Sequence, residues 1–190
     1  MPQFTIHTID SAPEASRETM RAVQQKYGFV PNLIGELAAA PAAVKAYATL
    51  SGLLEGTSLS PVEQQLVLIA ASVANGCHYC VAAHSAGLKM AGLAQDQIEA
   101  IRENCELRDR KLEQLRRFTS AVVEKRGHLD GPEVQAFLKA GYREEQVFEV
   151  LVGVAMKTLS NYANHLAKTP LDKQLEAFAW EPATALAIAR

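Results

Sequence analysis

Residues that favour helices fill this 190-residue chain from end to end. Alanine, leucine, glutamate, glutamine, lysine and arginine dominate it, and runs of alternating β-branched residues are almost absent. Proline and glycine interrupt the helical patterns at intervals, for example at Pro31, Pro61 and Pro170. The sequence therefore predicts an all-α fold. A chain of this length buries a sizeable core without staples, so we expect residues 1–190 to form a single domain.

The breaks place the expected helices along the chain. We expect them over residues 13–27, 33–39, 41–55, 61–75, 77–90, 95–104, 110–126, 132–139 and 143–168. The helix that begins at Pro61 is apolar over most of its surface, which is typical of a helix in the middle of a bundle. A weak internal similarity at an offset of about 81 residues pairs 60–91 with 141–172, which would make the chain a duplicated helical hairpin.

Reactive side chains concentrate at the start of one of these helices. Cys77 and Cys80 form a Cys-x-x-Cys motif, and His84 follows it. Because Asn75-Gly76 breaks the preceding helix, the cysteines should lie in the first turn of the next one. His84 comes four residues after Cys80 and seven after Cys77, so one helical face carries both sulfurs and the imidazole.

Such a pair of thiols reacts through the thiolate. A thiol with a pKa of about 8.5 is only about 3% ionised at pH 7, whereas a pKa near 6.5 gives about 75% thiolate, roughly 25-fold more nucleophile. The positive end of the helix, the second thiol and a nearby imidazole each lower a thiol pKa. The motif therefore indicates redox chemistry, with His84 as the base beside a cysteine nucleophile.

A zinc site is the alternative interpretation of the same residues. Cys77, Cys80 and His84 would supply three ligands, and a distant residue such as His165 would supply the fourth. That arrangement would suit a zinc-binding or redox-sensing interaction module. No motif for a flavin or haem is present, and we expect neither a cofactor nor a resident metal.

Other polar residues are interpreted from their positions. His78 lies about 100° around the helix from Cys77 and is expected to be exposed at the rim, whereas the Tyr79 phenol could point toward substrate. Cys105 stands alone between two polar helices and is expected to be inert. The polar segment 161–165 interrupts an apolar helix, so it should either make a hydrogen-bonded interhelix contact or line the thiol pocket.

Composition narrows the classes of partner and compartment. Lysine plus arginine total 19 against 21 for aspartate plus glutamate, and the net charge of -2 gives no electrostatic reason to expect nucleic acid or an anionic membrane. No apolar run approaches the roughly 18 residues of a membrane span, and the amino terminus has no apolar leader. We expect a cytoplasmic protein, and small molecules and proteins remain as its possible partners.

The chain resembles the carboxymuconolactone decarboxylase superfamily, in particular its alkyl hydroperoxidase D-like, peroxidase-related branch. The resemblance rests on GFVPNL at 28–33, LSPVE at 59–63, NGCHYCVAAH at 75–84, NYANH at 161–165 and TPLD at 169–172. It implies an all-helical bundle with the CxxC motif at the start of a central helix beside a buried pocket. It also implies a homo-oligomer, a trimer or hexamer.

The resemblance implies roles for the site residues. Cys80 would attack the peroxide, Cys77 would resolve the product, and His84 would relay protons. The position of the family's relay glutamate is Gln65 here, and Glu63, about 200° around the helix from it, is no simple replacement. Because glutamine carries no proton and general acid–base help is typically worth about 10² to 10⁴ in rate, we expect either a modest peroxidase at best or a different thiol-redox substrate.

These observations together predict a thiol-dependent peroxidase, an antioxidant oxidoreductase with peroxiredoxin-type activity and a redox-active disulfide. Its partners would be a hydroperoxide and a dithiol reductant, either a protein or a small thiol. A lactone-transforming or decarboxylating enzyme and the zinc-binding or redox-sensing module remain as alternatives. The secondary site candidates are Gln65, Tyr79, Glu63, His78 and His165.

Overall fold

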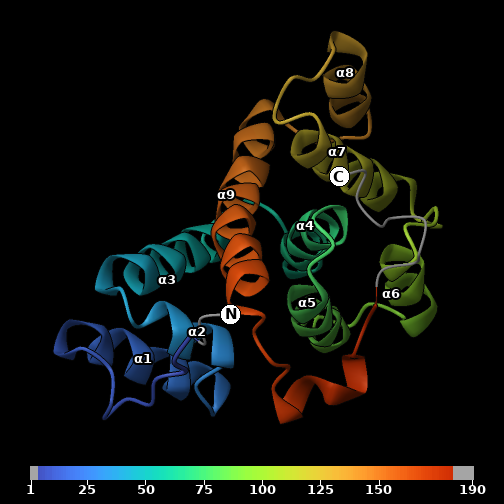
Figure 1. Ribbon diagram of the computed structural model, residues 1–190. Coiled ribbons are helices and arrows are strands. Elements are labelled where there is room, and N and C mark those ends of the chain that lie inside the picture. The colour runs from blue at the N-terminus through green and yellow to red at the C-terminus, as the bar shows by residue number, and fades with distance from the viewer. Residues whose placement is uncertain (1–3, 182–190) are drawn as a thin grey trace.

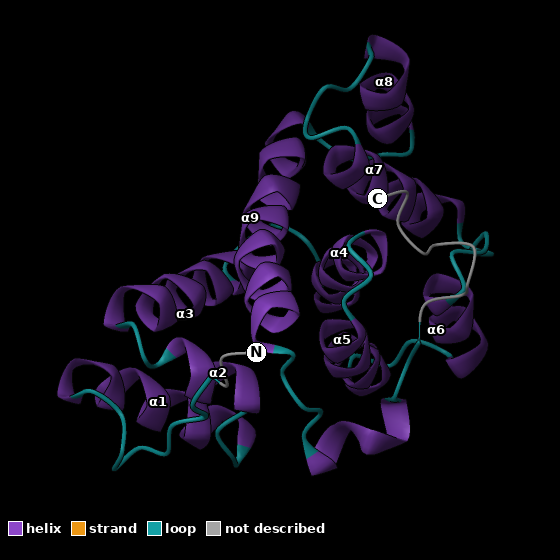
Figure 2. Cartoon of the chain, in the orientation of Figure 1, coloured by secondary structure: helices purple, strands orange, loops and turns teal. Residues whose placement is uncertain are grey.

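The computed structural model describes residues 4–181, and all the regular structure of this range is helical (Figure 2). The helices are α1 (Glu14–Tyr27), α2 (Asn32–Leu37), α3 (Pro41–Glu55), α4 (Pro61–Ala74), α5 (His78–Met90), α6 (Gln95–Arg102), α7 (Arg110–Glu124), α8 (Gly131–Lys139), α9 (Glu144–Ala167) and the 3-10 helix η1 (Lys173–Phe178). The all-α prediction is confirmed, and η1 is the element that sequence patterns did not predict. Within the described range, no helix is both long enough and apolar enough to cross a membrane.

Helices α4 and α5 lie in the middle of the molecule, with α9 running alongside (Figure 1). α4 packs against α5, α7 and α9, while α9 also packs against α3, and η1 packs against α5. Every residue of α4 from Leu66 to Val73 is buried. A helix without a polar face has to be covered on all sides, and this explains the central position of α4.

The start of α4 is fixed by a capping box. The Oγ of Ser60 accepts a hydrogen bond from the Glu63 N–H at 3.3 Å, and the Glu63 carboxylate accepts one from the Ser60 N–H at 2.8 Å. The same carboxylate pairs with Nζ of Lys111 at 3.0 Å. Glu63 therefore stabilises the end of α4 and joins it to α7.

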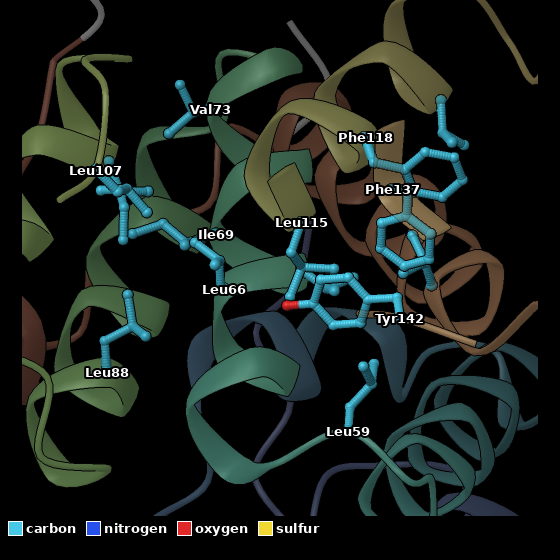
Figure 3. Packing of buried hydrophobic residues seen from close by; sticks show 14 of the residues in the cluster. Leu59, Leu66, Ile69, Val73, Leu88, Leu107, Leu115, Phe118, Phe137 and Tyr142 are labelled. Carbon is cyan, nitrogen blue, oxygen red and sulfur yellow. The ribbon is translucent and has the colours of Figure 1, made fainter. Parts of the chain in front are cut away.

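Two large apolar clusters flank the central helices, beside a small third one formed by Leu54, Leu68 and Met156. In the larger one, the rings of Phe118, Phe137 and Tyr142 stack in series with centroids 4.3 Å apart, next to Leu66 and Leu115 (Figure 3). The second cluster gathers side chains of α1, α2 and α3 around the first turn of α5; its members include Met20, Leu33, Ile34, Val44, Cys77, Tyr79 and Cys80. The CxxC motif is thus part of the protein core.

Close contact between α9 and α4 depends on Gly153. A Cβ atom at this position would lie 2.5 Å from Cγ1 of Val67. Any larger residue would hold the two helices apart, so this glycine brings the following turns of α9 against the centre of the molecule.

The internal similarity does not correspond to two helical hairpins. Residues 60–91 form α4 and α5, but residues 144–167 form one continuous helix. Where the first segment has Asn75-Gly76, the second has Met156-Lys157, and this pair contains no helix breaker.

Candidate thiol redox site

The turn between α4 and α5 places both cysteines at the start of α5. Gly76 adopts φ 65°, a left-handed conformation that favours glycine. Cys77 is the N-cap of α5, and its N–H donates to the Ser72 carbonyl at 2.9 Å. Cys80 lies within the first turn, where the positive end of the helix favours a negative charge. Both side chains are free thiols, with exposed fractions of 0% for Cys77 and 1% for Cys80.

Helix α9 supplies the polar groups that face the sulfurs. Nδ2 of Asn164 lies 3.2 Å from Sγ of Cys80 and 3.6 Å from Sγ of Cys77. Oγ of Ser160 lies 3.8 Å from Sγ of Cys80. Among the described residues, Oδ1 of Asn164 is buried without a hydrogen-bond partner. The Asn164 amide therefore offers a thiolate a neutral hydrogen-bond donor, the Ser160 hydroxyl donates to the Met156 carbonyl, and Oδ1 of Asn164 is left as a free acceptor.

The polar segment 161–165 has both of the roles expected for it, lining the thiol site and making an interhelix contact. Asn164 lines the thiol site, whereas Asn161 makes an interhelix contact, accepting from Nδ2 of Asn75 at 2.9 Å and donating to Oγ of Ser72 at 3.4 Å. His165 is exposed.

His84 is held between two side chains. Its Nε2 lies 2.8 Å from Nζ of Lys157, and its Nδ1 lies 3.0 Å from Oε1 of Gln65. Because a lysine ammonium only donates, Nε2 is the acceptor and Nδ1 carries the proton that it donates to Gln65. Gly87 makes room for this contact, since a Cβ there would lie 2.8 Å from Cδ of Gln65.

The two cysteines have opposite pKa shifts. Burial raises the pKa of Cys80, but the hydrogen bond from Cys77 and the positive charge and hydrogen bond of Lys157 outweigh it, so the pKa lies well below the ordinary thiol value. The hydrogen bond to Cys80 and burial raise the pKa of Cys77 far above that value. Cys80 is therefore the thiolate of the pair, and Cys77 remains a thiol.

His84 is neutral in this site. Burial and the charge of Lys157 both hold its pKa well below the usual value for histidine. None of the hydrogen bonds of the described residues joins His84 to either sulfur; Nε2 bonds to Lys157 instead. The structure thus differs from the expected contact between base and nucleophile, because a lysine from α9 occupies the accepting nitrogen.

Tyr79 connects three segments of the fold. Its phenol donates to the Asp172 carboxylate and accepts from the Leu33 N–H at 3.4 Å, while Asp172 also accepts from the Asn32 N–H at 3.0 Å. Its exposed fraction is 2%. The expectation of a phenol directed at substrate is replaced by a link from α5 to α2 and to the segment that follows α9.

The remaining candidates lie apart from the thiols. Glu63 is engaged with Lys111, and His78 is half-buried instead of exposed at the rim. Cys105 is exposed, and its Sγ contacts the Glu103 carbonyl at 3.8 Å.

The zinc interpretation lacks a ligand set. In the part of the chain that the structure describes, no three or more histidine, cysteine, aspartate or glutamate side chains are grouped to hold a metal ion. His165 is exposed, and Nε2 of His84 faces the Lys157 ammonium, which would repel a cation. These residues do not fit the tetrahedral zinc site that the spacing allowed.

A cavity of about 60 Å³ borders His84 and Gln65. Its other lining residues are Tyr27, Tyr47, Ser51, Leu54, Glu55, Gln64, Leu68 and Met156. Tyr47 connects the cavity to the thiols: burial raises its pKa, and the negative charge of Cys80 acts in the same direction. A water molecule occupies about 30 Å³ in the liquid, so the cavity suits a small molecule.

Comparison with known proteins identifies a family whose model matches the segment that contains the thiols. The carboxymuconolactone decarboxylase family model matches residues 38–109, which include α4, both cysteines and His84. The resemblance to the carboxymuconolactone decarboxylase superfamily is confirmed. A search of the curated proteins finds no match.

Solved structures with the alkyl hydroperoxidase D-like (AhpD-like) fold match most of the chain. An uncharacterized peroxidase-related protein from Ralstonia eutropha JMP134, described as an alkylhydroperoxidase AhpD core, has a TM-score of 0.81 and 22% identity over 92% of this chain and 95% of its own. An uncharacterized peroxidase-related protein from Silicibacter sp. TM1040 has a TM-score of 0.76 and 16% identity, over 92% of this chain and 95% of its own. A cysteine-to-alanine variant of the debrominase Bmp8, in complex with 2,3,4-tribromopyrrole, has a TM-score of 0.78 and 18% identity, over 94% of this chain and 96% of its own.

Sequence patterns did not identify Lys157, Ser160 and Tyr47 as residues of the thiol site. A signal for the first was present, because Lys157 is the only lysine or arginine of α9 and lies in its apolar stretch. Ser160 and Asn164 follow it at three and seven residues, which is the spacing of one helical face. The pattern did not reveal that this face opposes the cysteines.

Proposed function

We propose that this protein is a thiol-dependent peroxidase in which Cys80 attacks a hydroperoxide and Cys77 resolves the product. The observation that carries the proposal is the asymmetry of the two buried thiols. The pKa of Cys80 is lowered and that of Cys77 is raised, so the pair already contains one nucleophile and one proton-bearing resolving thiol. The AhpD-like fold and the family match support the same chemistry.

The reaction uses both thiols. The Cys80 thiolate attacks the terminal oxygen of R–O–O–H, an S–O bond forms, and the O–O bond breaks with its electrons leaving on RO⁻. A proton converts RO⁻ to ROH. Cys77 then loses its proton and attacks the Cys80 sulfenic acid, which releases hydroxide that is protonated to water. An external dithiol reduces the resulting disulfide and returns both thiols.

The donors around Cys80 match this sequence. The Asn164 amide, 3.2 Å from the sulfur, stabilises the attacking thiolate. Its unpartnered Oδ1 is an acceptor for the O–H of an incoming hydroperoxide. Because both sulfurs are buried, hydrogen peroxide and small alkyl hydroperoxides are the expected oxidants.

Assembly into a homo-oligomer is part of the proposal. Helix α9 exposes four large apolar side chains spaced at helical intervals along its length: Phe148, Leu151, Tyr162 and Leu166. Exposed apolar surface of this extent is typical of an interaction site. A second copy of the chain would cover this apolar surface. The dithiol reductant would have to reach the buried cysteines from another side.

Reductive dehalogenation is a second candidate, supported by the fold of the Bmp8 debrominase. A thiolate attacks bromine as it attacks a peroxide oxygen: an S–Br bond forms, and the C–Br electrons stay on carbon, which takes a proton. Cys77 then displaces bromide to give the same disulfide. A decarboxylase or lactone-transforming function has no use for the thiolate and thiol of this site, which favours the two redox candidates.

The test is single-turnover oxidation followed by stopped flow. The protein carries Cys105→Ser to remove the exposed thiol, and hydrogen peroxide, ethyl hydroperoxide or 2,3,4-tribromopyrrole is added in separate experiments. The peroxidase proposal predicts rapid disulfide formation with the peroxides. Cys77→Ser should stop at a sulfenic acid on Cys80 that dimedone traps, and Cys80→Ser should not react. Oxidation no faster than that of a free thiol would contradict the proposal, and reaction with the bromopyrrole alone would favour dehalogenation.

A further inference from the structure

Lys157 is a buried cation without a carboxylate partner. Its exposed fraction is 1%, and none of the salt bridges formed by the described residues includes it. A buried ammonium is costly unless an opposite charge and hydrogen bonds compensate it. Its close contacts are Nε2 of His84, at 2.8 Å, and the Tyr47 ring, whose centroid lies 6.0 Å away. The thiol site is the neighbouring source of a balancing anion, because the charge of Lys157 favours the thiolate form of Cys80.

The position of Lys157 on α9 identifies that anion. Ser160 and Asn164, three and seven residues further on, share its helical face. Both contact Sγ of Cys80, at 3.8 and 3.2 Å. The face of α9 that holds Lys157 is therefore the face that covers the nucleophilic sulfur, and the positive charge of Lys157 helps to lower the pKa of Cys80.

We propose that Lys157 is a catalytic residue of the thiol site: its ammonium is the counter-ion of the Cys80 thiolate and the acid that protonates the leaving group. His84 and Gln65 are positioning residues that hold the lysine. This inference rests on the proposed function for the protonation step, whereas the ion pair with Cys80 stands independently of any substrate.

The hydrogen bonds of His84 agree with a positioning role. Its Nδ1–H is directed to Gln65, and its Nε2 accepts from Lys157, so neither nitrogen has a proton for the reacting atoms. The lowered pKa of His84 keeps the ring in this neutral form. Of His84 and Lys157, the lysine therefore bears the proton that is available to the thiol site.

The steps balance with Lys157 as the acid. When the O–O bond breaks, Lys157 gives its proton to RO⁻ and becomes a neutral amine. It then accepts the Cys77 proton as that thiol attacks the Cys80 sulfenic acid, and returns it to the departing hydroxide to form water. Reduction of the disulfide by an external dithiol restores two thiols, and Lys157 takes the Cys80 proton to regenerate the thiolate and the ammonium.

The ion pair is tested by the pH dependence of Cys80 alkylation. Iodoacetamide reacts with the thiolate, so its rate at Cys80, followed by peptide mass spectrometry, reports the pKa of that thiol. Groups facing Cys80 from the neighbouring elements are Cys77, Lys157, Ser160, Asn164 and Tyr47. Lys157→Met should raise the Cys80 pKa and slow alkylation at pH 6 by tenfold or more. Lys45→Met, the same change at an exposed position of α3, is the matched control.

Lys157→Arg separates the charge from the proton. Arginine keeps the positive charge but does not release its proton at accessible pH. This variant should therefore keep the low thiol pKa and still lose rate in the peroxide step. It also keeps the test informative if Lys157→Met does not fold, which thermal unfolding would show. If folded Lys157→Met kept the low Cys80 pKa, or folded Lys157→Arg lost it, the proposed ion pair would be overturned.

The acid role is tested with two oxidants of similar size. Ethyl hydroperoxide expels a strongly basic alkoxide, whereas peracetic acid expels a weakly basic carboxylate that needs no proton. Rates of disulfide formation are divided by the thiolate fraction known from alkylation. Both Lys157 variants should lose about 10² or more with ethyl hydroperoxide and much less with peracetic acid. Equal losses would overturn the acid role. Failure of the wild-type protein to react with either oxidant would instead reject the peroxidase function, while the alkylation result would still decide the ion pair.

Discussion

Nζ of Lys157 lies 2.8 Å from Nε2 of His84 in the interior of the protein. A cation at this distance disfavours protonation of the imidazole, and burial acts in the same direction, so the pKa of His84 is held well below its usual value. The histidine is thereby an acceptor for the lysine and not a base for the thiol. The contact between Lys157 and His84 therefore affects both the protonation of the site and the stability of the protein in acid.

The first prediction concerns stability in acid. The pKa of His84 is lowered in the folded state from a reference value of 6.5. Below that pH the unfolded chain binds a proton that the folded protein does not, so stability rises with pH in this window and is lost as the pH falls below about 6.5. The loss from this residue is about 1.4 kcal/mol per pH unit. Urea unfolding at pH 7.0 and 5.5 measures it.

His84→Gln is the control for that prediction, because it removes the titrating group and leaves all other acids and bases in place. The difference in unfolding free energy between the two pH values should be smaller in the variant by about 1.4 kcal/mol. Equal pH dependence in both proteins would show that His84 is protonated in the folded state.

A second prediction restores a carboxylate beside the histidine. In Gln65→Glu, the new carboxylate would accept the Nδ1–H bond that Gln65 now accepts at 3.0 Å. A negative charge there raises the pKa of His84 and provides a proton carrier next to the cavity. Disulfide formation with hydrogen peroxide should become faster by about tenfold or more, as general acid–base help is typically worth 10² to 10⁴. Gln95→Glu on the exposed surface of α6 should leave the rate unchanged.

A third prediction separates structure from chemistry at Tyr79. Tyr79→Phe removes the donor to the buried Asp172 carboxylate and the acceptor for the Leu33 N–H. Unpaired buried polar groups cost about 1 to 3 kcal/mol, so the unfolding free energy should fall by that amount. The alkylation profile of Cys80 should stay the same. A stable variant with a less reactive Cys80 would instead place the phenol in the chemistry.

The fourth prediction concerns the space beneath Gln65. In Gly87→Ala the added Cβ would lie 2.8 Å from Cδ of Gln65, and displacing that side chain should cost about 1 to 3 kcal/mol despite the better helix propensity of alanine. The double variant with Gln65→Ala should recover most of the loss. Gly52→Ala, where a Cβ meets no atom within 4 Å, is the control and should stabilise α3 by about 1 kcal/mol. A purely additive double variant would show that the two residues are not in contact.

Local patterns predicted the elements of this fold well because their causes are local. Proline at the first position of α4, the Ser60 cap and the Asn75-Gly76 break act within a few residues, and the helices end within two residues of the expected positions. The same local information placed Cys77 and Cys80 at the start of α5. The feature that helical patterns left out is η1, a 3-10 helix without a comparable period.

The sequence by itself determined the helices, the CxxC motif at the start of α5 and the face that this motif shares with His84. Only the tertiary structure decided what this face meets. Lys157 lies 73 residues from His84 along the chain, and Asn164 lies 84 residues from Cys80. Helical periodicity fixes which residues share a face, but it contains no information on which two faces oppose each other. That choice depends on how α9 packs against α4 and α5, and it turned the expected base into a neutral support for a buried lysine.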